Sequence, residues 1–447
     1  MFTTTLLLSS SLFFSPSWAF TPPSWEALQS TASLTNRPAP PIYHDTLPES
    51  AAADLSLPVL YRDKDCVCAA CESVWLALEV KNVEYVTVLV DKKSDEQIPR
   101  ISWPTTTDDE SNTAAAAAAA AAAKTTIIDP VKLLEQIQSR YPDTFPHFYP
   151  KLSSAVDASR CNILRLPGVM PRNSDEALRS LAPYLFRPDG TLVKPSSHAV
   201  TLEEVEEMQE EYYLGDFLCG KEITGADMIW APYLERYAVQ LPMVFPNKAR
   251  LDPRNRNVYG EVDNWYKVME REVPAYSCRV MGDARHWRKC LEVATKIHND
   301  RVVEEEERVC LPDVPEQSSG WWMKKNRFAK AGEIWREYCS TRPWTADSPG
   351  GEVALFIMRN RDMIVNAAVA ASDYFDQDTA DEALREVIQV LVDWDVYFDQ
   401  SSEEETEQPL SEDGRKMALF VAEEMIQVPR HMGMIPSSVL WEVIRSC

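Results

Sequence analysis

The chain has 447 residues, 45% of them apolar, and a formal net charge of −24. This length is enough for about two or three domains, and the apolar fraction can fill their cores. No cluster of lysine and arginine interrupts the acidic sequence. A protein that binds nucleic acid through its phosphates needs such a cluster, so we expect no nucleic-acid partner.

The N-terminal segment has the features of a targeting leader. The apolar stretch Leu6–Phe14 is too short to span a bilayer, and the small residues Ser17 and Ala19 predict cleavage by a signal peptidase after Ala19. The following segment, residues 20–56, begins with Phe20 and is rich in Pro, Ser and Ala. It resembles the bipartite plastid leader of diatoms and related algae.

This resemblance implies a signal peptide over residues 1–19, a transit peptide or linker over residues 20–56, and a plastid location. Simple secretion is the alternative. No later segment is long and apolar enough to be a membrane helix.

Residues 57–150 alternate between strand and helix patterns, in the order of the thioredoxin fold. The expected elements are a strand at Val59–Tyr61, a helix at Cys71–Val80, strands at Val83–Val90, Ile98–Trp103 and Thr125–Asp129, and a helix at Val131–Tyr141. The run of ten alanines at Ala114–Ala123 is expected to be a surface insertion between neighbouring strands, because longer loops cost little extra entropy.

The remainder of the chain has mainly helical patterns, in two regions joined by an acidic linker at residues 298–320. The first region, residues 151–297, contains two helix-capping boxes and an amphipathic helix, at Thr201 with Glu204, Thr224 with Asp227, and Val262–Arg271. The second region, residues 321–447, has expected helices at Trp321–Tyr338, Glu352–Tyr374, Thr379–Tyr397, Arg415–Gln427 and from Pro436. We find no chemical motif in this second region.

The sequence Cys68-Ala69-Ala70-Cys71 lies where the first strand gives way to a helix. The first N–H groups of a helix lack intrahelical partners, and the helix dipole adds positive potential there. A thiolate at this place is stabilised, so we expect the pKa of Cys68 to fall and its sulfur to be reactive. Cys71, one turn later, could resolve a mixed disulfide formed on Cys68.

The surrounding sequence resembles a group of plant and algal glutathione S-transferases related to the omega class, to dehydroascorbate reductases and to glutaredoxins. The resemblance is carried by LYRD at 60–63, CESVWLALE at 71–79, FLCGKEITGADMIWAPYLERY at 217–237 and PAYSCRV at 274–280. It implies an α/β thioredoxin-like domain followed by an all-α C-terminal domain, here with an extra all-α region. It also implies that Cys68 is the nucleophile and that Cys71 is the second cysteine of the motif.

The resemblance implies further site residues. Ile98-Pro99 matches the residue before a cis-proline, whose backbone pairs with the cysteinyl part of glutathione. Asp129 matches the acid of a Glu-Ser pair that holds the amino end of glutathione. The partners implied are glutathione, as co-substrate, and a small electrophilic or disulfide substrate, with a homodimer as the family's usual assembly. The Thr224–Asp227 box matches a folding element of the family.

Three departures from the family pattern leave alternatives open. Ala69 and Ala70 replace Pro and Phe between the cysteines, and Pro130 replaces the Ser beside Asp129. Only six residues separate Asp91 from Ile98, too few for the family's usual second helix. We expect a thiol transferase or glutathione-dependent reductase. The alternatives are a non-catalytic scaffold with the same fold and a thiol–disulfide protein that needs no glutathione.

The cysteines and aromatic residues allow other interpretations. Cys68 could be a buried structural thiol. Zinc could bind Cys66, Cys68 and Cys71, but a fourth ligand is not evident, so no metal site is expected. Cys66 is expected to decorate the loop or to pair transiently under oxidation. The aromatic residues at 230, 233 and 237 are expected to pack in a core rather than to line a substrate pocket.

Overall fold

A computed structural model describes residues 22–32, 39–48, 56–66, 68–91, 98–104, 129–144, 146, 217, 221–244, 260–282, 285–289, 328–398, 410–425 and 427–446. Several expected features lie outside these ranges: the signal peptide, the alanine run, the strand over 125–128, the helix after Thr201 and the acidic linker. None of the helices within the described ranges has the length and apolar character needed to cross a membrane.

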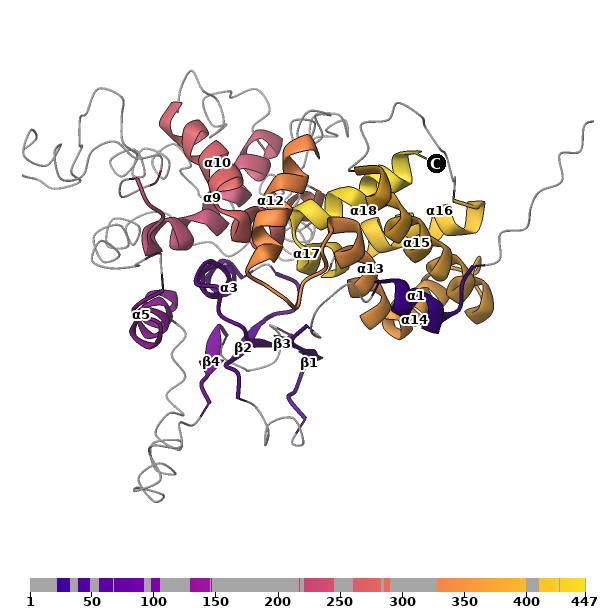
Figure 1. The fold of residues 1–447 in the computed structure, drawn as a ribbon, viewed down its shortest axis with the longest axis horizontal. Coiled ribbons are helices and arrows are strands. Elements are labelled where there is room, and N and C mark those ends of the chain that lie inside the picture. Colours follow the sequence, from indigo (N-terminus) through magenta and orange to yellow (C-terminus); the bar gives the residue numbers. More distant parts are fainter. Residues whose placement is uncertain are drawn as a thin grey trace, which may run out of the picture.

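A mixed four-stranded sheet forms the base of the molecule (Figure 1). Its order is β1 (Ile42–His44), β3 (Val86–Val90), β2 (Val59–Asp63) and β4 (Arg100–Ser102). Both β1 and β2 run parallel to β3, whereas β4 runs antiparallel to β2. β3, with the sequence VTVLV, is buried along its whole length. A run of β-branched residues suits such a central strand, because both of its faces are covered.

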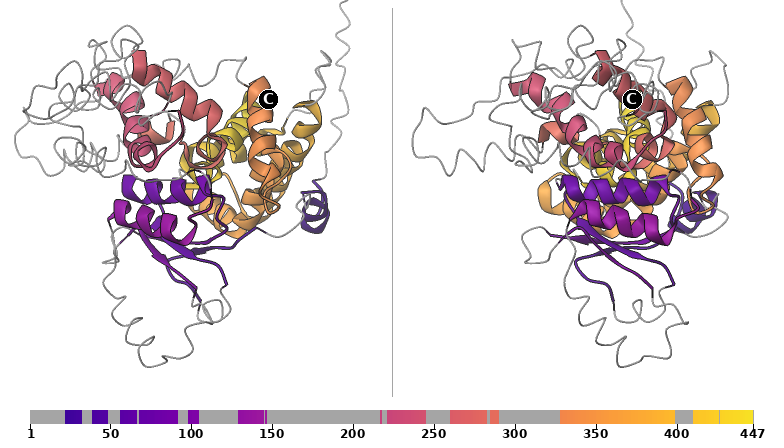
Figure 2. Two further views of the ribbon diagram at one scale, coloured as in Figure 1. Left: turned by 60° about the vertical axis from the view of Figure 1, so that its left-hand side comes forward. Right: turned by 90° about the vertical axis from the view of Figure 1, so that its left-hand side faces the viewer.

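Two helices lie side by side against one face of this sheet (Figure 2). α3 (Ala69–Val80) joins β2 to β3, and ten of its residues are buried because other helices cover its outer side. α5 (Pro130–Arg140) is amphipathic and buries only Leu133, Leu134 and Ile137. The expected cis peptide bond between Ile98 and Pro99 is present. These elements agree with the expected thioredoxin-like unit.

A helical layer covers α3 and shares its core. It consists of α9 (Gly225–Val244), α10 (Gly260–Glu272) and η4 (Tyr276–Val280). At the start of α9, the Asp227 carboxylate accepts from the Thr224 N–H at 2.8 Å, as the capping box predicts. The Thr224 hydroxyl donates to the same carboxylate at 3.0 Å. The other Asp227 oxygen accepts from Trp265 Nε1 at 2.9 Å, which ties α9 to α10.

The C-terminal region builds a second helical layer beside the first (Figure 1). Its elements are α12 (Phe328–Ser340), α13 (Pro349–Arg359), α14 (Arg361–Ala371), α15 (Gln377–Phe398), α16 (Glu412–Leu419), η8 (Phe420–Glu424), α17 (Gln427–Met432) and α18 (Met434–Ser446). The single helix expected over Glu352–Tyr374 is instead two, α13 and α14. The chain breaks at Asn360, whose side-chain amide donates to the Phe356 carbonyl at 2.8 Å and so competes with the helical bonds.

Ordered structure begins before Val59, which differs from the expectation of a leader or linker there. α1 (Trp25–Ala32) packs on α13 and α15, with Leu28 fully buried. Trp25 Nε1 donates to Asp381 of α15 at 2.9 Å. The sequence does not predict this helix, because Trp25 and Leu28 stand among polar residues in a stretch rich in Pro, Ser and Ala. β1 then extends the sheet at its outer edge.

The two helical layers meet at η4. Buried residues of η4, α12 and α18 share a small core that contains Cys278, Trp335 and Ile435. The turn between α17 and α18 passes so close to η4 that a Cβ on Gly433 would collide with the Cys278 carbonyl oxygen. Gly433 also has a φ of +86°, which favours glycine. The C-terminal region is therefore packed into the molecule rather than appended to it.

Candidate functional site

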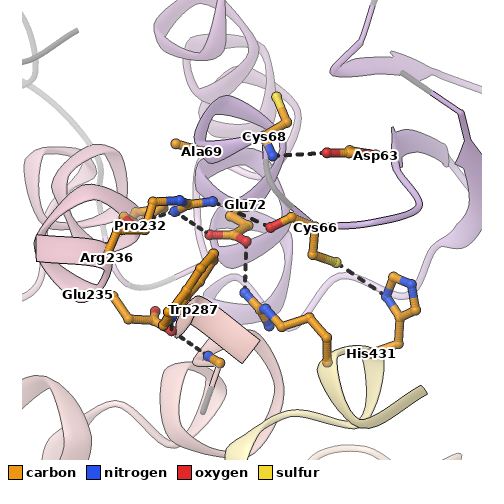
Figure 3. Close-up of polar contacts among 12 residues, drawn as sticks. Asp63, Cys66, Cys68, Ala69, Glu72, Pro232, Glu235, Arg236, Trp287 and His431 are labelled. Atoms are coloured by element: carbon orange, nitrogen blue, oxygen red, sulfur yellow. Dashed lines mark hydrogen bonds and ion pairs between the residues drawn. The ribbon is translucent and has the colours of Figure 1, made fainter. Parts of the chain in front are cut away.

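Cys68 occupies the position just before α3, at the end of the loop that follows β2. Its backbone is extended, and its carbonyl accepts the first bond of the helix, from the Glu72 N–H at 3.2 Å. Its own N–H donates to Oδ2 of the buried Asp63 at 3.0 Å (Figure 3). The side chain is half-buried and makes no capping hydrogen bond. The structure thus places Cys68 at the helix N-terminus, where the sequence predicted it.

Cys71 differs from Cys68 in its surroundings. It is buried in the first turn of α3. Burial raises the pKa of the Cys71 thiol well above its usual range, and a hydrogen bond with Cys68 raises it further. Cys71 therefore stays protonated near neutral pH, whereas Cys68 has the more exposed sulfur.

The cis Ile98–Pro99 bond lies beside the loop that carries Cys68. β2 and β4 pair with Tyr61 opposite Arg100. Continuing this antiparallel register brings Ile98–Pro99 alongside the end of β2, just before the cysteine loop. The paired residues end at Arg100, so the backbone of Ile98 lies beyond the β2–β4 ladder. The structure thus brings Ile98, Pro99 and Cys68 to the same end of the sheet.

Asp129 precedes α5 and caps it. Its Oδ1 accepts from the Val131 N–H at 3.0 Å, and Pro130 occupies the first helical position. The dipole of α5 stabilises a carboxylate here, and proline at this position lacks only an N–H that would be unpaired anyway. Asp129 therefore stabilises the start of α5 through Oδ1. Its other oxygen, Oδ2, is the one that could accept a hydrogen bond from an amino group of a ligand.

Cys66 is part of the core instead of decorating the loop. It is buried with a φ of +51°, and its Sγ accepts from Arg62 Nη1 at 3.1 Å. His431 of α17 lies on its other side, with Nδ1 3.4 Å from Sγ. His431 Nε2 lies 2.9 Å from the Lys64 carbonyl, so Nε2 carries the proton and Nδ1 accepts the thiol proton.

This network holds Cys66 as a thiol. Burial raises the pKa of Cys66 to about 11. Burial, Arg62 and Arg430 keep the pKa of His431 well below its usual range, so the imidazole is neutral. Transient oxidation of Cys66 is therefore disfavoured, because a disulfide forms from a thiolate.

A buried ion network lies beneath the cysteine loop, on the inner side of α3 (Figure 3). Glu72 of α3 pairs with Arg236 of α9 through Oε2 and with Arg430 of α17 through Oε1, each at 2.9 Å. Arg236 also donates to the Cys66 carbonyl at 3.4 Å. Sequence reasoning missed these residues, although Glu72 and Arg236 lie in the family-like segments. No periodic pattern marks Arg430.

Glu235 lies next to this network and is fully buried. Its Oε1 accepts from Trp287 Nε1 at 2.6 Å and from the Gly282 N–H, and its Oε2 accepts from the Tyr276 hydroxyl at 3.2 Å. Burial raises the pKa of Glu235 to about 7, against the opposing effect of Arg430. The carboxyl group therefore titrates in the physiological range.

The three aromatic residues of α9 all pack in or against the core that α9 shares with α3, and Tyr233 is the least buried of them. Trp230 and Tyr237 are buried in the core, as predicted. Tyr233 is half-buried and lies near the cysteine site. Burial is the main reason that the pKa of Tyr233 rises to about 12, and the nearby Cys68 contributes to the rise. Tyr233 is therefore the aromatic residue of α9 that a substrate bound to Cys68 could meet.

Within the described ranges, His, Cys, Asp and Glu side chains do not gather into a group of three or more that could hold a metal ion.

Comparison with solved structures finds partial likenesses to glutathione transferases. Omega 3C from Trametes versicolor is 14% identical, with 55% of this chain and 93% of that chain covered and a TM-score of 0.34. The dehydroascorbate reductase of Chlamydomonas reinhardtii is 14% identical and has a TM-score of 0.26. The match covers 49% of this chain and 99% of the reductase. Omega 1C from Trametes versicolor is 13% identical and has a TM-score of 0.28. The match covers 54% of this chain and 96% of that transferase. Neither protein-family models nor curated proteins give a match.

Proposed function

We propose that the protein is a thiol transferase or glutathione-dependent reductase with Cys68 as its nucleophile. The observation that carries this proposal is the position of Cys68: a half-buried residue at the N-terminus of α3, whose N–H donates to Asp63, at the end of the sheet where Ile98 and Pro99 also lie. The unpaired N–H groups of the first helical turn stabilise a thiolate there. The sequence motifs around Cys68 support the same assignment.

The reaction would proceed by thiol–disulfide exchange. The Cys68 thiolate attacks one sulfur of a disulfide substrate, forms a mixed disulfide and releases the other sulfur as a thiolate that takes up a proton. A glutathione thiolate then attacks the mixed disulfide. A second glutathione completes the reduction, so that two glutathione molecules are oxidised to one disulfide per substrate disulfide reduced. Because Cys71 is buried and protonated, we expect glutathione rather than Cys71 to resolve the Cys68 adduct.

Two features fit glutathione at this site. The Ile98 backbone, beyond the β2–β4 ladder, can pair with the cysteinyl part of the peptide. The Asp129 oxygen not used in capping can accept from the amino end. Pro130 offers neither a hydroxyl nor an N–H, so we expect weaker glutathione binding than a site with serine there would give.

The test is the glutathione-dependent reduction of the mixed disulfide of glutathione and 2-mercaptoethanol. The wild type is compared with Cys68→Ser, Cys71→Ser and Cys339→Ser, the last a control at a half-buried cysteine on α12. We expect Cys68→Ser to abolish the activity and both other variants to retain it. Equal loss in Cys68→Ser and Cys71→Ser would instead support a dithiol mechanism that needs no glutathione.

A non-catalytic scaffold is the second candidate, favoured by Pro130 and by the short connection between β3 and β4. An inactive wild type that still folds would support it. In that case alkylation of Cys68 by iodoacetamide should also be no faster than that of Cys339.

We also propose that the protein works in a plastid. The support is the leader sequence, with Phe20 after the expected cleavage site. Residues 1–24 fused to a fluorescent protein should direct it to the plastid of a diatom, and Phe20→Ala should prevent this. Export of the fusion from the cell would support secretion instead.

A further inference from the structure

The C-terminal region reaches the cysteine loop through α17. His431 Nε2 donates to the Lys64 carbonyl at 2.9 Å, and its Nδ1 lies 3.4 Å from the Cys66 sulfur (Figure 3). Lys64 and Cys66 belong to the loop that leads from the end of β2 to Cys68. A histidine from a region in which the sequence shows no chemical motif thus contacts the chain just before the expected nucleophile.

Arg430, the neighbour of His431, contacts the chain just after Cys68. Its Nη2 pairs with Oε1 of Glu72 at 2.9 Å, and the Glu72 N–H donates to the Cys68 carbonyl at 3.2 Å in the first turn of α3. Both side chains of the pair are buried. α17 therefore contacts the loop before Cys68 and the helix turn after it.

The backbone of Cys66 needs support from its neighbours. Its φ of +51° lies in the left-handed region, which residues other than glycine seldom adopt. Such a conformation persists where the surrounding structure holds it. The Cys66 sulfur accepts from Arg62 at 3.1 Å, and the Cys66 carbonyl accepts from Arg236 at 3.4 Å. His431 adds the third contact, so we expect its loss to let the loop relax and to displace Cys68.

His431 contacts the loop as a neutral side chain. Burial lowers the pKa of His431 well below its usual range, and the nearby Arg62, Arg430 and His286 lower it further, against the opposing effect of its bond to the loop carbonyl. Replacing this imidazole by another neutral side chain therefore removes no charge from the surroundings of Cys68.

Other titratable groups face Cys68 directly. They include Asp63 of β2, whose Oδ2 accepts from the Cys68 N–H, Cys71 of α3 and Tyr233 of α9. A change at His431 leaves all three in place. An effect of His431 on the reactivity of Cys68 would therefore report a change in where Cys68 lies relative to α3 and these groups.

We propose that Arg430 and His431 are positioning residues for Cys68, and that the C-terminal region thereby completes the reactive site. They fix the loop before Cys68 and the helix turn after it. Cys68 then stays where the unpaired N–H groups of α3 stabilise its thiolate. The inference rests on the proposed function, because it takes Cys68 as the nucleophile.

The test measures how fast iodoacetamide alkylates Cys68 in the full chain, with peptide mass spectrometry to separate it from the other cysteines. The rate is followed over pH values on both sides of the ordinary thiol pKa of about 8.5, and no glutathione is needed. We expect His431→Leu to slow the alkylation about tenfold near neutral pH, because a pKa higher by about one leaves about a tenth of the thiolate. His431→Gln should restore most of the rate, since its amide can donate to the Lys64 carbonyl.

Val439→Ala is the matched control for lost stability. Val439 is buried in α18, and its core cluster contains no residue of β2 or α3 within the described ranges. The change should lower the midpoint of urea unfolding and leave the pH profile of Cys68 alkylation as in the wild type. An unchanged profile in His431→Leu, or equal slowing in Val439→Ala, would overturn the proposal.

A second pair of variants applies if His431→Leu does not fold. Cys66→Ala removes the sulfur beside His431, whereas Cys66→Ser keeps a hydroxyl that can donate to Nδ1. We expect Cys66→Ala to slow the alkylation of Cys68 and Cys66→Ser to keep it, and equal rates would contradict the proposal. If wild-type Cys68 reacts no faster than Cys339, the proposed function fails together with this inference. A fast Cys68 that is indifferent to His431 overturns this inference alone.

Discussion

The buried carboxyl group of Glu235 makes the free energy of unfolding depend on pH. Its carboxyl is surrounded by donors from Trp287, Tyr276 and Gly282, yet burial raises its pKa to about 7 from an ordinary 4.5. The folded protein therefore holds this proton more tightly than the unfolded chain. The stability that this provides is complete below about pH 4.5 and is lost as the pH rises to about 7.

Glu235→Gln should remove this dependence, because the amide has the same shape and no charge to gain. The free energy of unfolding of the variant relative to wild type should rise by on the order of 3 kcal/mol between pH 4.5 and pH 7. Urea unfolding at several pH values measures it. If the free energies of unfolding of wild type and Glu235→Gln differ by the same amount at every pH, the pKa of Glu235 is not raised.

The cysteines were predictable only in part. A cysteine at the start of a helix can be recognised from the strand and helix patterns around it, so the place of Cys68 followed from the sequence. The state of Cys66 did not, because it depends on His431, 365 positions further along the chain. No spacing rule links residues that far apart, and only the packing of α17 brings them together.

At the scale of elements, the turn between α17 and α18 fixes how the two helical layers meet. Gly433→Ala would place a methyl group against the Cys278 carbonyl and would also strain a positive φ. We expect a loss of about 2 kcal/mol or more in the free energy of unfolding. Gly332→Ala is the control, since nothing lies within 4 Å of its Cβ position. It should be stabilising by about 0.5–1 kcal/mol, because alanine favours the helix. If Gly433→Ala and Gly332→Ala change the stability measured by thermal or urea unfolding equally, Gly433 does not lie close to the Cys278 carbonyl.

Elements with strong periodicity were predicted well, and their ends less so. β2, β3, α3 and α5 follow from β-branched runs and apolar spacing. The break at Asn360 was missed because the apolar pattern continues across it, and only a side-chain bond to the Phe356 carbonyl interrupts the helix. α1 was missed because its few anchoring residues lie among Pro, Ser and Ala.

At the scale of the whole molecule, Glu72 joins three parts of the chain: α3, α9 and α17. Glu72→Gln would leave Arg236 and Arg430 buried without their carboxylate. Breaking a buried pair in this way costs about 3–5 kcal/mol. The matched control is Glu442→Gln, which breaks a surface pair with Arg445 and should cost at most about 1 kcal/mol. Comparable losses in urea unfolding would show that the network contributes little.

The packing of α1 limits how many N-terminal residues a protease can remove in a cell without disturbing the fold. Leu28 is wholly enclosed and Trp25 is bonded to Asp381, so a protease that cut beyond Trp25 would remove part of the folded core. The carbonyls of Pro22 and Pro23 also accept from Arg385 at 3.2 and 3.0 Å. The contacts of Pro22 to Leu28 therefore permit a mature N-terminus at or before Pro22 and disfavour one beyond Trp25. The predicted cleavage after Ala19 satisfies this limit, and the mass of the purified native protein would test it.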